Sequence, residues 1–170
     1  VRFDLFSQPG GLASPALLSD MLRLEEDLES MELVRAVHSP AGLVAYGATI
    51  LGGPYAIPSA ANVRRVLTLE GSREASQSVI SEEYDRGQIV VQVRDVGANA
   101  FDELVDVIEP KVQKALSAHD VQAVTTGTPY VAYAGINRIT ADLRSSLITA
   151  FVAVTLLVTF LFRSFRVGLL

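Results

Sequence analysis

The sequence contains no cysteine, and this absence excludes disulfides and thiolate metal sites. Only two histidines are present, so a histidine metal cluster is not expected. Residues 143–170 contain no acidic residue, and their three arginines give this segment a charge of +3. The net charge of the whole chain is −5, which leaves −8 for residues 1–142. Such an acidic domain lacks the basic surface that nucleic acid requires, and we expect no nucleic-acid partner.

One stretch contains no charged residue, no proline and no glycine: residues 145–162, with the sequence SSLITAFVAVTLLVTFLF. As an α-helix this stretch would be about 27 Å long, which is close to the hydrocarbon thickness of a bilayer, about 30 Å. A central helix of a soluble domain is the competing interpretation. The roughly 140 other residues are few to wrap such a helix, because other elements claim most of them. The stretch therefore predicts a transmembrane helix, with the lipid bilayer as a partner.

Arginines on both sides of the span set its expected orientation. Arg144 precedes the span, whereas Arg163 and Arg166 follow it, and all three are predicted to lie at the membrane interface. Basic flanks tend to stay cytoplasmic. Residues 163–170 are therefore expected inside, and residues 1–142 outside, which in a bacterium is the periplasm. The chain begins with Val1 rather than Met, and we expect a fragment of a larger protein. A complete domain with one C-terminal anchor is the alternative.

Two parts of the chain share the order strand, helix, strand. Strands are indicated by alternating or β-branched apolar residues, and helices by apolar residues that recur every three or four positions. The expected elements are residues 1–6, 15–30 and 33–37 in the first copy and residues 88–94, 100–117 and 121–126 in the second. Two such units are predicted to interleave into one four-stranded sheet with both helices on one face, the ferredoxin-like double split-βαβ arrangement. The predicted fold class is α+β, and an accidental similarity is the alternative.

The remaining segments complete the expected organisation. Residues 40–87 are predicted to be an irregular excursion, turn-rich over 40–60, with short helices near 59–69 and 72–80. Pro110 is expected to kink or end the second long helix near Glu109. The predicted divisions are an α+β domain at 1–128, a connecting helix at 129–144, the span at 145–162 and a basic end at 163–170.

Few side chains suggest chemistry. No nucleophile and base can be singled out, so we expect neither enzymatic activity nor a cofactor. His38 is interpreted as a strand-end residue and His119 as part of a helix-to-strand turn. Residues 25–29 contain four acidic side chains, which we interpret as a solvated helix face, with a cation site as the alternative.

The apolar side chains between residues 43 and 57 form the candidate binding surface. If they are exposed, they make an apolar patch, which often marks an interaction site. The functional interpretation is a wall of a path for a hydrophobic substrate. The alternative is packing against the sheet or against a second domain. The candidate wall residues are Leu43, Tyr46, Ile50, Tyr55 and Ile57.

Three motifs carry a family resemblance. Residues 126–129 (TGTP), followed by a helix that enters a span, and residues 161–170 (LFRSFRVGLL) resemble the end of the first periplasmic loop and the second transmembrane helix of exporters of the RND superfamily. Within that superfamily the chain is most similar to bacterial MMPL-like exporters, which include the type associated with hopanoid transport. Residues 33–39 (LVRAVHS) match the point where such proteins close their first βαβ unit.

The resemblance implies a porter domain in a secondary transporter of the bacterial inner membrane, driven by proton flow. Its implied substrates are lipidic or hydrophobic. Its implied partners are further transmembrane helices and a second porter domain of the parent protein, and a homo-oligomer is compatible with it. The proton relay of the family uses ionisable residues in later transmembrane helices, and the span 145–162 contains none. The alternative function is a membrane-anchored periplasmic interaction or sensor domain without transport activity.

Overall fold

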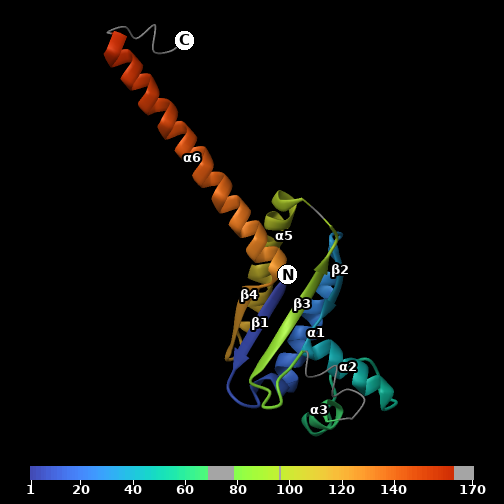
Figure 1. The fold of residues 1–170 in the computed structure, drawn as a ribbon. Helices are drawn as coiled ribbons and strands as arrows, with labels where there is room; N and C mark the ends of the chain where they lie inside the picture. The colour runs from blue at the N-terminus through green and yellow to red at the C-terminus, as the bar shows by residue number, and fades with distance from the viewer. Residues whose placement is uncertain (69–78, 96, 163–170) are drawn as a thin grey trace. The chain divides into compact units, whose positions relative to one another are not determined.

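The computed structural model describes residues 1–68, 79–95 and 97–162. The chain divides into two compact units, Val1–Tyr130 and Val131–Leu170. The first unit contains a four-stranded antiparallel sheet and the helices that cover it (Figure 1). The second contains most of one long apolar helix.

The sheet has the strand order β2-β3-β1-β4, and all neighbouring strands are antiparallel. Its strands are β1 (Arg2–Ser7), β2 (Val34–His38), β3 (Arg86–Val93) and β4 (Val121–Thr126). The four strands predicted from the sequence are all present and share this sheet. Because β3 lies between β1 and β2, and β1 lies between β3 and β4, each strand–helix–strand copy encloses one strand of the other.

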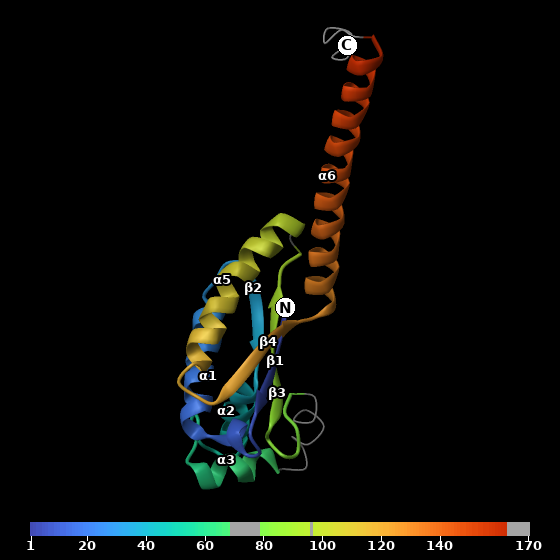
Figure 2. The same cartoon turned by 90° about the vertical axis from the view of Figure 1, so that its left-hand side faces the viewer.

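Helices α1 (Pro15–Glu29) and α5 (Ala98–Leu116) lie on one face of the sheet, as predicted (Figure 2). A short 3-10 helix, η1 (Gly11–Ala13), leads into α1. The period-two pattern turns alternate strand residues toward these helices. Leu24 in α1 is 6% exposed and Ile108 in α5 is 0% exposed, so both predicted core positions are in the core. The buried strand residues are Phe3, Leu5, Val34, Val37, Ile89 and Val91.

Helix α5 continues through Pro110 to Leu116, so the expectation of a boundary near Glu109 is wrong. Pro110 is exposed, and so is Asp106, whose carbonyl loses its helical donor to the proline ring. Water can donate a hydrogen bond to the Asp106 carbonyl, because this side of the helix is exposed. Burial of the opposite face of the helix keeps both halves on the sheet.

The prediction of a turn-rich region at 40–60 is wrong for its first half, because residues 40–50 form helix α2 (Pro40–Ile50). The Ser39 hydroxyl caps this helix and accepts hydrogen bonds from the backbone N–H groups of Ala41 and Gly42, at 3.0 and 3.3 Å. A Cβ atom on Gly47 would overlap with Val66 of the next helix, so this glycine allows close packing rather than a turn.

The short helix expected near 59–69 is confirmed as α3 (Ala60–Leu67). The helix expected near 72–80 lies almost entirely outside the described residues. Strand β3 then begins at Arg86, two residues earlier than expected.

Helix α6 (Thr128–Phe162) is one unbroken helix of 35 residues. Its segment Tyr130–Leu161 is long and apolar enough to cross a membrane, with a mean hydropathy of 1.8 over its most apolar window. None of that window is buried inside the protein. The connecting helix predicted at 129–144 and the apolar helix predicted at 145–162 are therefore one continuous helix in the structure.

Candidate functional site

One face of α1 carries Leu22, Glu25, Glu26 and Glu29, whose spacing of three and four residues places them on the same side of the helix. This face borders a pocket of about 530 Å³, which we call the acidic pocket. The other walls come from the end of β2, the cap and first two turns of α2, the loop after α2, Val79, and the first half of β3. The complete described lining is Leu22, Glu25, Glu26, Glu29, Val37, His38, Ser39, Gly42, Leu43, Tyr46, Tyr55, Val79, Gln88 and Val90.

Glu25 lies at the floor of the acidic pocket and is only 6% exposed. By distance and angle its Oε1 atom has no hydrogen-bond partner among the described residues, although Ser39 and the Gly42 backbone lie close enough to the carboxylate to lower its pKa. The carboxylate abuts the first turn of α2, where a Cβ atom on Gly42 would lie 2.8 Å from both of its oxygens. Burial raises the pKa of Glu25 to about 7; hydrogen bonding with Ser39 and with the Gly42 backbone opposes this rise, while the charge of Glu29 adds to it.

This burial corrects the interpretation of residues 25–29 as a solvated face. Glu26, Asp27 and Glu29 are exposed, but Glu25 is not. The sequence contained a usable signal, because Glu25 lies two helical turns after the buried Leu18 and so continues the apolar stripe. Because Glu25 is charged, the sequence pattern alone suggests that it lies on the exposed face of the helix.

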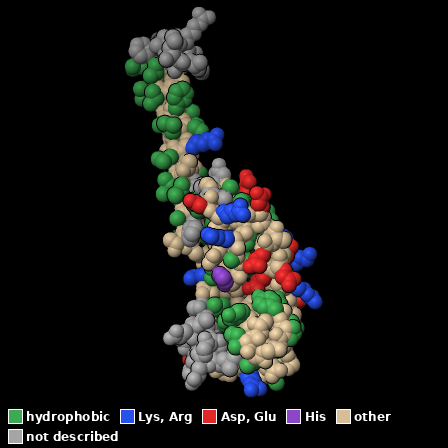
Figure 3. All heavy atoms as spheres, turned by 90° about the vertical axis from the view of Figure 1, so that its right-hand side faces the viewer, with side chains coloured by type: hydrophobic (Ala, Val, Ile, Leu, Met, Phe, Trp, Pro, Cys, Tyr) green, Lys and Arg blue, Asp and Glu red, His purple; other side chains and the backbone are tan. Residues whose placement is uncertain are grey.

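The other acidic groups lie nearer the opening of the pocket. The Glu29 Oε1 atom accepts a hydrogen bond from the backbone N–H of Val37 at 3.0 Å, which fixes this carboxylate beside β2. Burial, followed by the charges of Glu25, Glu29 and Glu26, raises the pKa of Tyr55. The Tyr55 hydroxyl therefore lies within the field of all three carboxylates. Figure 3 shows acidic and apolar side chains next to one another on this unit.

The structure gathers only part of the predicted substrate-path wall. Leu43, Tyr46 and Tyr55 line the acidic pocket, with the two tyrosines 62% and 56% exposed. Ile57 instead lines a second pocket of about 480 Å³ between α2 and α3, and Ile50 is 65% exposed and lines neither pocket. Leu43 and Ile57 also pack against the core, as the alternative interpretation expected.

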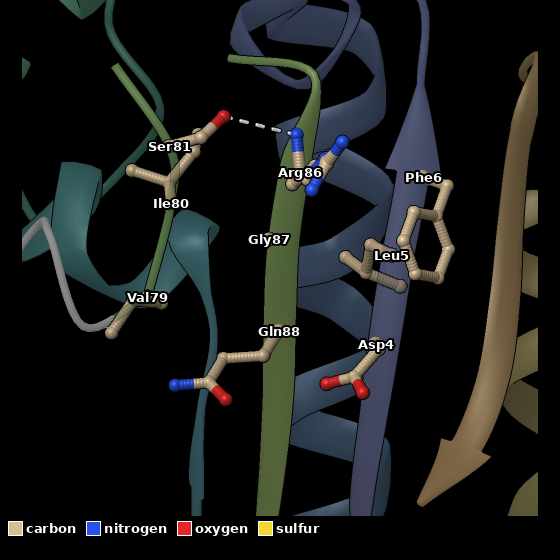
Figure 4. A pocket seen from close by; sticks show the side chains of 9 residues that line it. All are labelled: Asp4, Leu5, Phe6, Val79, Ile80, Ser81, Arg86, Gly87 and Gln88. Carbon is tan, nitrogen blue, oxygen red and sulfur yellow. Dashed lines mark hydrogen bonds between the residues drawn. The ribbon is translucent and has the colours of Figure 1, made fainter. Parts of the chain in front are cut away.

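A third hollow, of about 300 Å³, lies over β1 and β3 (Figure 4). Asp4 and Phe6 of β1 and Arg86 and Gln88 of β3 line it. The Ser81 hydroxyl at its edge accepts a hydrogen bond from the Arg86 backbone N–H at 3.0 Å and donates one to Asp85 at 2.6 Å. These bonds hold the turn into β3, so this hollow reflects the local turn.

The two histidines occupy the places predicted for them. His38 is the last residue of β2, and His119 lies in the turn between α5 and β4. The His119 Nε2 atom is 3.0 Å from Asp20 Oδ2 of α1, which ties this turn to the first copy. Among the interface arginines, Arg144 is exposed on α6, whereas Arg163 and Arg166 lie outside the described residues. Their placement at a membrane surface stays a prediction.

No protein-family model, curated protein or solved structure matches this chain. The function is therefore argued from the sheet, the acidic pocket and helix α6.

Proposed function

We propose that this chain is the periplasmic porter domain and second transmembrane helix of an MMPL-like exporter of the RND superfamily. Its α+β unit is the ferredoxin-like double split-βαβ domain of such a porter, and its parent moves lipidic or hydrophobic substrates across the bacterial inner membrane with proton flow. The strand order with two interleaved copies supports this proposal. The sequence motifs at 126–129 and 161–170 support it independently.

The observation that carries the proposal is the continuity of α6. Strand β4 ends at Thr126, and α6 begins at Thr128, so Gly127 alone separates sheet from helix. Gly127 has a φ of 113°, which is available to glycine and strained for other residues. The helix then continues without interruption into the apolar segment. A helical connection transmits motion, whereas a flexible linker would decouple the two units.

The acidic pocket supports a substrate-handling role for the outer unit. Ligand pockets are mostly apolar, with a few convergent polar groups, and typically enclose about 300–1,000 Å³. The acidic pocket, at about 530 Å³, combines Leu22, Leu43 and Val90 with the carboxylates of α1. A plain anchor attached to an interaction or sensor domain is the alternative, and an export measurement on the parent protein distinguishes the two.

The coupling role is tested by Thr140→Pro in the full-length parent. Thr140 lies inside α6, where proline removes a backbone donor and clashes with the preceding turn, at a cost of about 3 kcal/mol or more. Export of a hydrophobic substrate should fall, while protein level and membrane insertion stay near normal. Thr140→Ala is the matched control, because it keeps the backbone N–H and removes only the γ-methyl group and the hydroxyl, which donates to the Ile136 carbonyl at 2.9 Å.

Two results would contradict the proposal. If Thr140→Pro exports at the wild-type rate, coupling through α6 is wrong. If the unaltered parent moves no hydrophobic substrate, the sensor alternative replaces the exporter.

The orientation is tested with compartment-dependent reporters in the parent protein. A periplasmic reporter on the N-terminal side and a cytoplasmic reporter after Leu170 should both be active, because two arginines follow the span and one precedes it. If the reporters are active only when the cytoplasmic one is on the N-terminal side and the periplasmic one follows Leu170, the assigned orientation is wrong.

A further inference from the structure

We infer that the acidic pocket binds a ligand with a protonated amine on an apolar body, and that the Glu25 carboxylate accepts a hydrogen bond from that amine. This inference deepens the proposed function by naming a substrate class. It rests on the proposed function only for the claim that such a ligand is transported.

The first support is the unpartnered oxygen of Glu25. A buried polar atom is nearly always hydrogen-bonded in a folded protein, and one without a partner calls for an explanation. Glu25 is 6% exposed, borders the pocket and has no partner for Oε1 among the described residues. A ligand N–H group in the pocket would supply the missing donor. A charge-assisted hydrogen bond of this kind is stronger than a neutral one.

The second support is the charge of the lining. Glu26 and Glu29 join Glu25 on α1, and His38 is the basic residue of the described lining, which includes no lysine or arginine. The pocket therefore favours a cation. In the parts of the chain that the structure describes, no group of three or more His, Cys, Asp or Glu side chains is arranged to hold a metal ion. An organic cation fits this site better than a metal.

The third support is the apolar and aromatic part of the lining. Leu22, Leu43 and Val90 are half-buried and offer contact to a hydrocarbon body. Tyr46 and Tyr55 offer aromatic faces, which attract cations. A quaternary ammonium group could also use the tyrosines, but it has no N–H to donate. Glu25 therefore favours a protonated amine, which keeps an N–H to donate, over a quaternary ammonium group.

The test is calorimetric titration of the whole 170-residue chain in a non-ionic detergent at pH 8, with octylamine as the probe. Octyltrimethylammonium and octanol serve as comparison ligands, since the first lacks an N–H donor and the second lacks the charge. Octylamine should bind about tenfold or more tightly than either, as a hydrogen bond to a charged group implies.

Two variants examine the role of Glu25. Glu25→Gln should weaken octylamine binding about tenfold or more. Gly42→Ala keeps the charge but pushes the carboxylate from its place, and it should also weaken binding. Glu103→Gln removes an exposed carboxylate of α5 outside the pocket and should bind like the wild type. Circular dichroism should show that all three variants are folded.

The inference is overturned if folded Glu25→Gln binds octylamine like the wild type, or if octanol binds as tightly as octylamine. Export by the parent is measured separately. If the parent exports neutral hydrophobic compounds but this chain does not bind octylamine, the exporter stands and the substrate class is wrong. If octylamine binds through Glu25 but the parent exports nothing, the amine site stands and the exporter is wrong.

Discussion

The two strand–helix–strand copies build one sheet, yet they differ in what their helices bury. Helix α5 buries only apolar side chains among those described on its inner face, whereas α1 also buries Glu25. The first copy is followed by α2 and α3 before β3 begins, and the second is followed by a single glycine and then α6. The same supersecondary unit therefore forms a pocket wall in one copy and leads to the apolar helix in the other.

The difference shows that the insertion after β2 creates the acidic pocket. Ser39, Gly42, Leu43 and Tyr46 all belong to α2 or its cap and close the pocket over α1. Removing α2 would expose Glu25 to water. The buried acid is thus a consequence of the insertion rather than of the repeated unit itself.

The largest expected effect concerns what the copies share, which is a core beneath each helix. Leu24→Ala in α1 and Ile108→Ala in α5 should each lower the free energy of unfolding by about 2–5 kcal/mol, because each leaves a cavity in a packed core. Denaturant unfolding of the chain in detergent, followed by circular dichroism, measures this. Val107→Ala is the control, since Val107 is 48% exposed on the same helix as Ile108. Negligible losses at both Leu24 and Ile108 would contradict the shared core.

The next largest effect concerns the first copy alone, because the ionisation of its buried Glu25 should make the free energy of unfolding depend on pH. Its pKa is about 7 in the folded chain, against an ordinary value of 4.5, so the folded state binds more protons between these pH values. Stability should therefore fall as pH rises through this window, by at most about 3 kcal/mol. Glu25→Gln should remove that fall and be more stable than the wild type at pH 8, but not at pH 4.

Glu26→Gln is the control for this pH dependence, because it changes an exposed carboxylate on the same helix. It should keep the wild-type pH profile. An unchanged profile in Glu25→Gln would mean that Glu25 ionises at an ordinary pH and that its burial has no electrostatic consequence.

A smaller effect tests the insertion that distinguishes the first copy. Gly47→Ala should destabilise the chain by about 1–3 kcal/mol, because its Cβ would overlap with Val66 and force α2 and α3 apart. The same unfolding measurement applies. Adding Val66→Ala should recover part of the loss by making room for the new methyl group. A stabilised Gly47→Ala chain would show that α2 and α3 do not pack closely.

The sequence predicted the shared features well, because they follow from periodicity. Alternation in residues 1–6 and stripes in residues 15–30 and 100–117 specify which faces are buried before any contact is known. The repeated pattern predicted that the four strands share one sheet, and the structure gives their order as β2-β3-β1-β4. Helix α6 was predictable because an uncharged run of that length has few alternatives.

The insertion and the pocket were harder to predict. Gly42 and Gly47 suggested turns, but they serve close contacts with Glu25 and Val66, which belong to other helices. Glu25 looked solvated because its burial depends on α2, a later part of the chain. Leu43, Tyr46 and Tyr55 were predicted as a wall, but the carboxylate they surround could be identified only once the two helices were placed together.

The smallest expected effect concerns a contact that joins the two copies. The Lys111 Nζ atom of α5 lies 2.6 Å from Asp27 Oδ2 of α1, with both side chains open to solvent. A double-mutant cycle with Asp27→Asn and Lys111→Met should give a coupling free energy of about 0.2–1 kcal/mol, because exposed ion pairs gain little over hydration. The coupling should shrink further in 1 M salt, where the screening length falls to about 3 Å. A coupling free energy well above this range, and unchanged by salt, would contradict this prediction. It would mean that the ion pair is shielded from water, so that the two helices stabilise each other through charge as well as through the core.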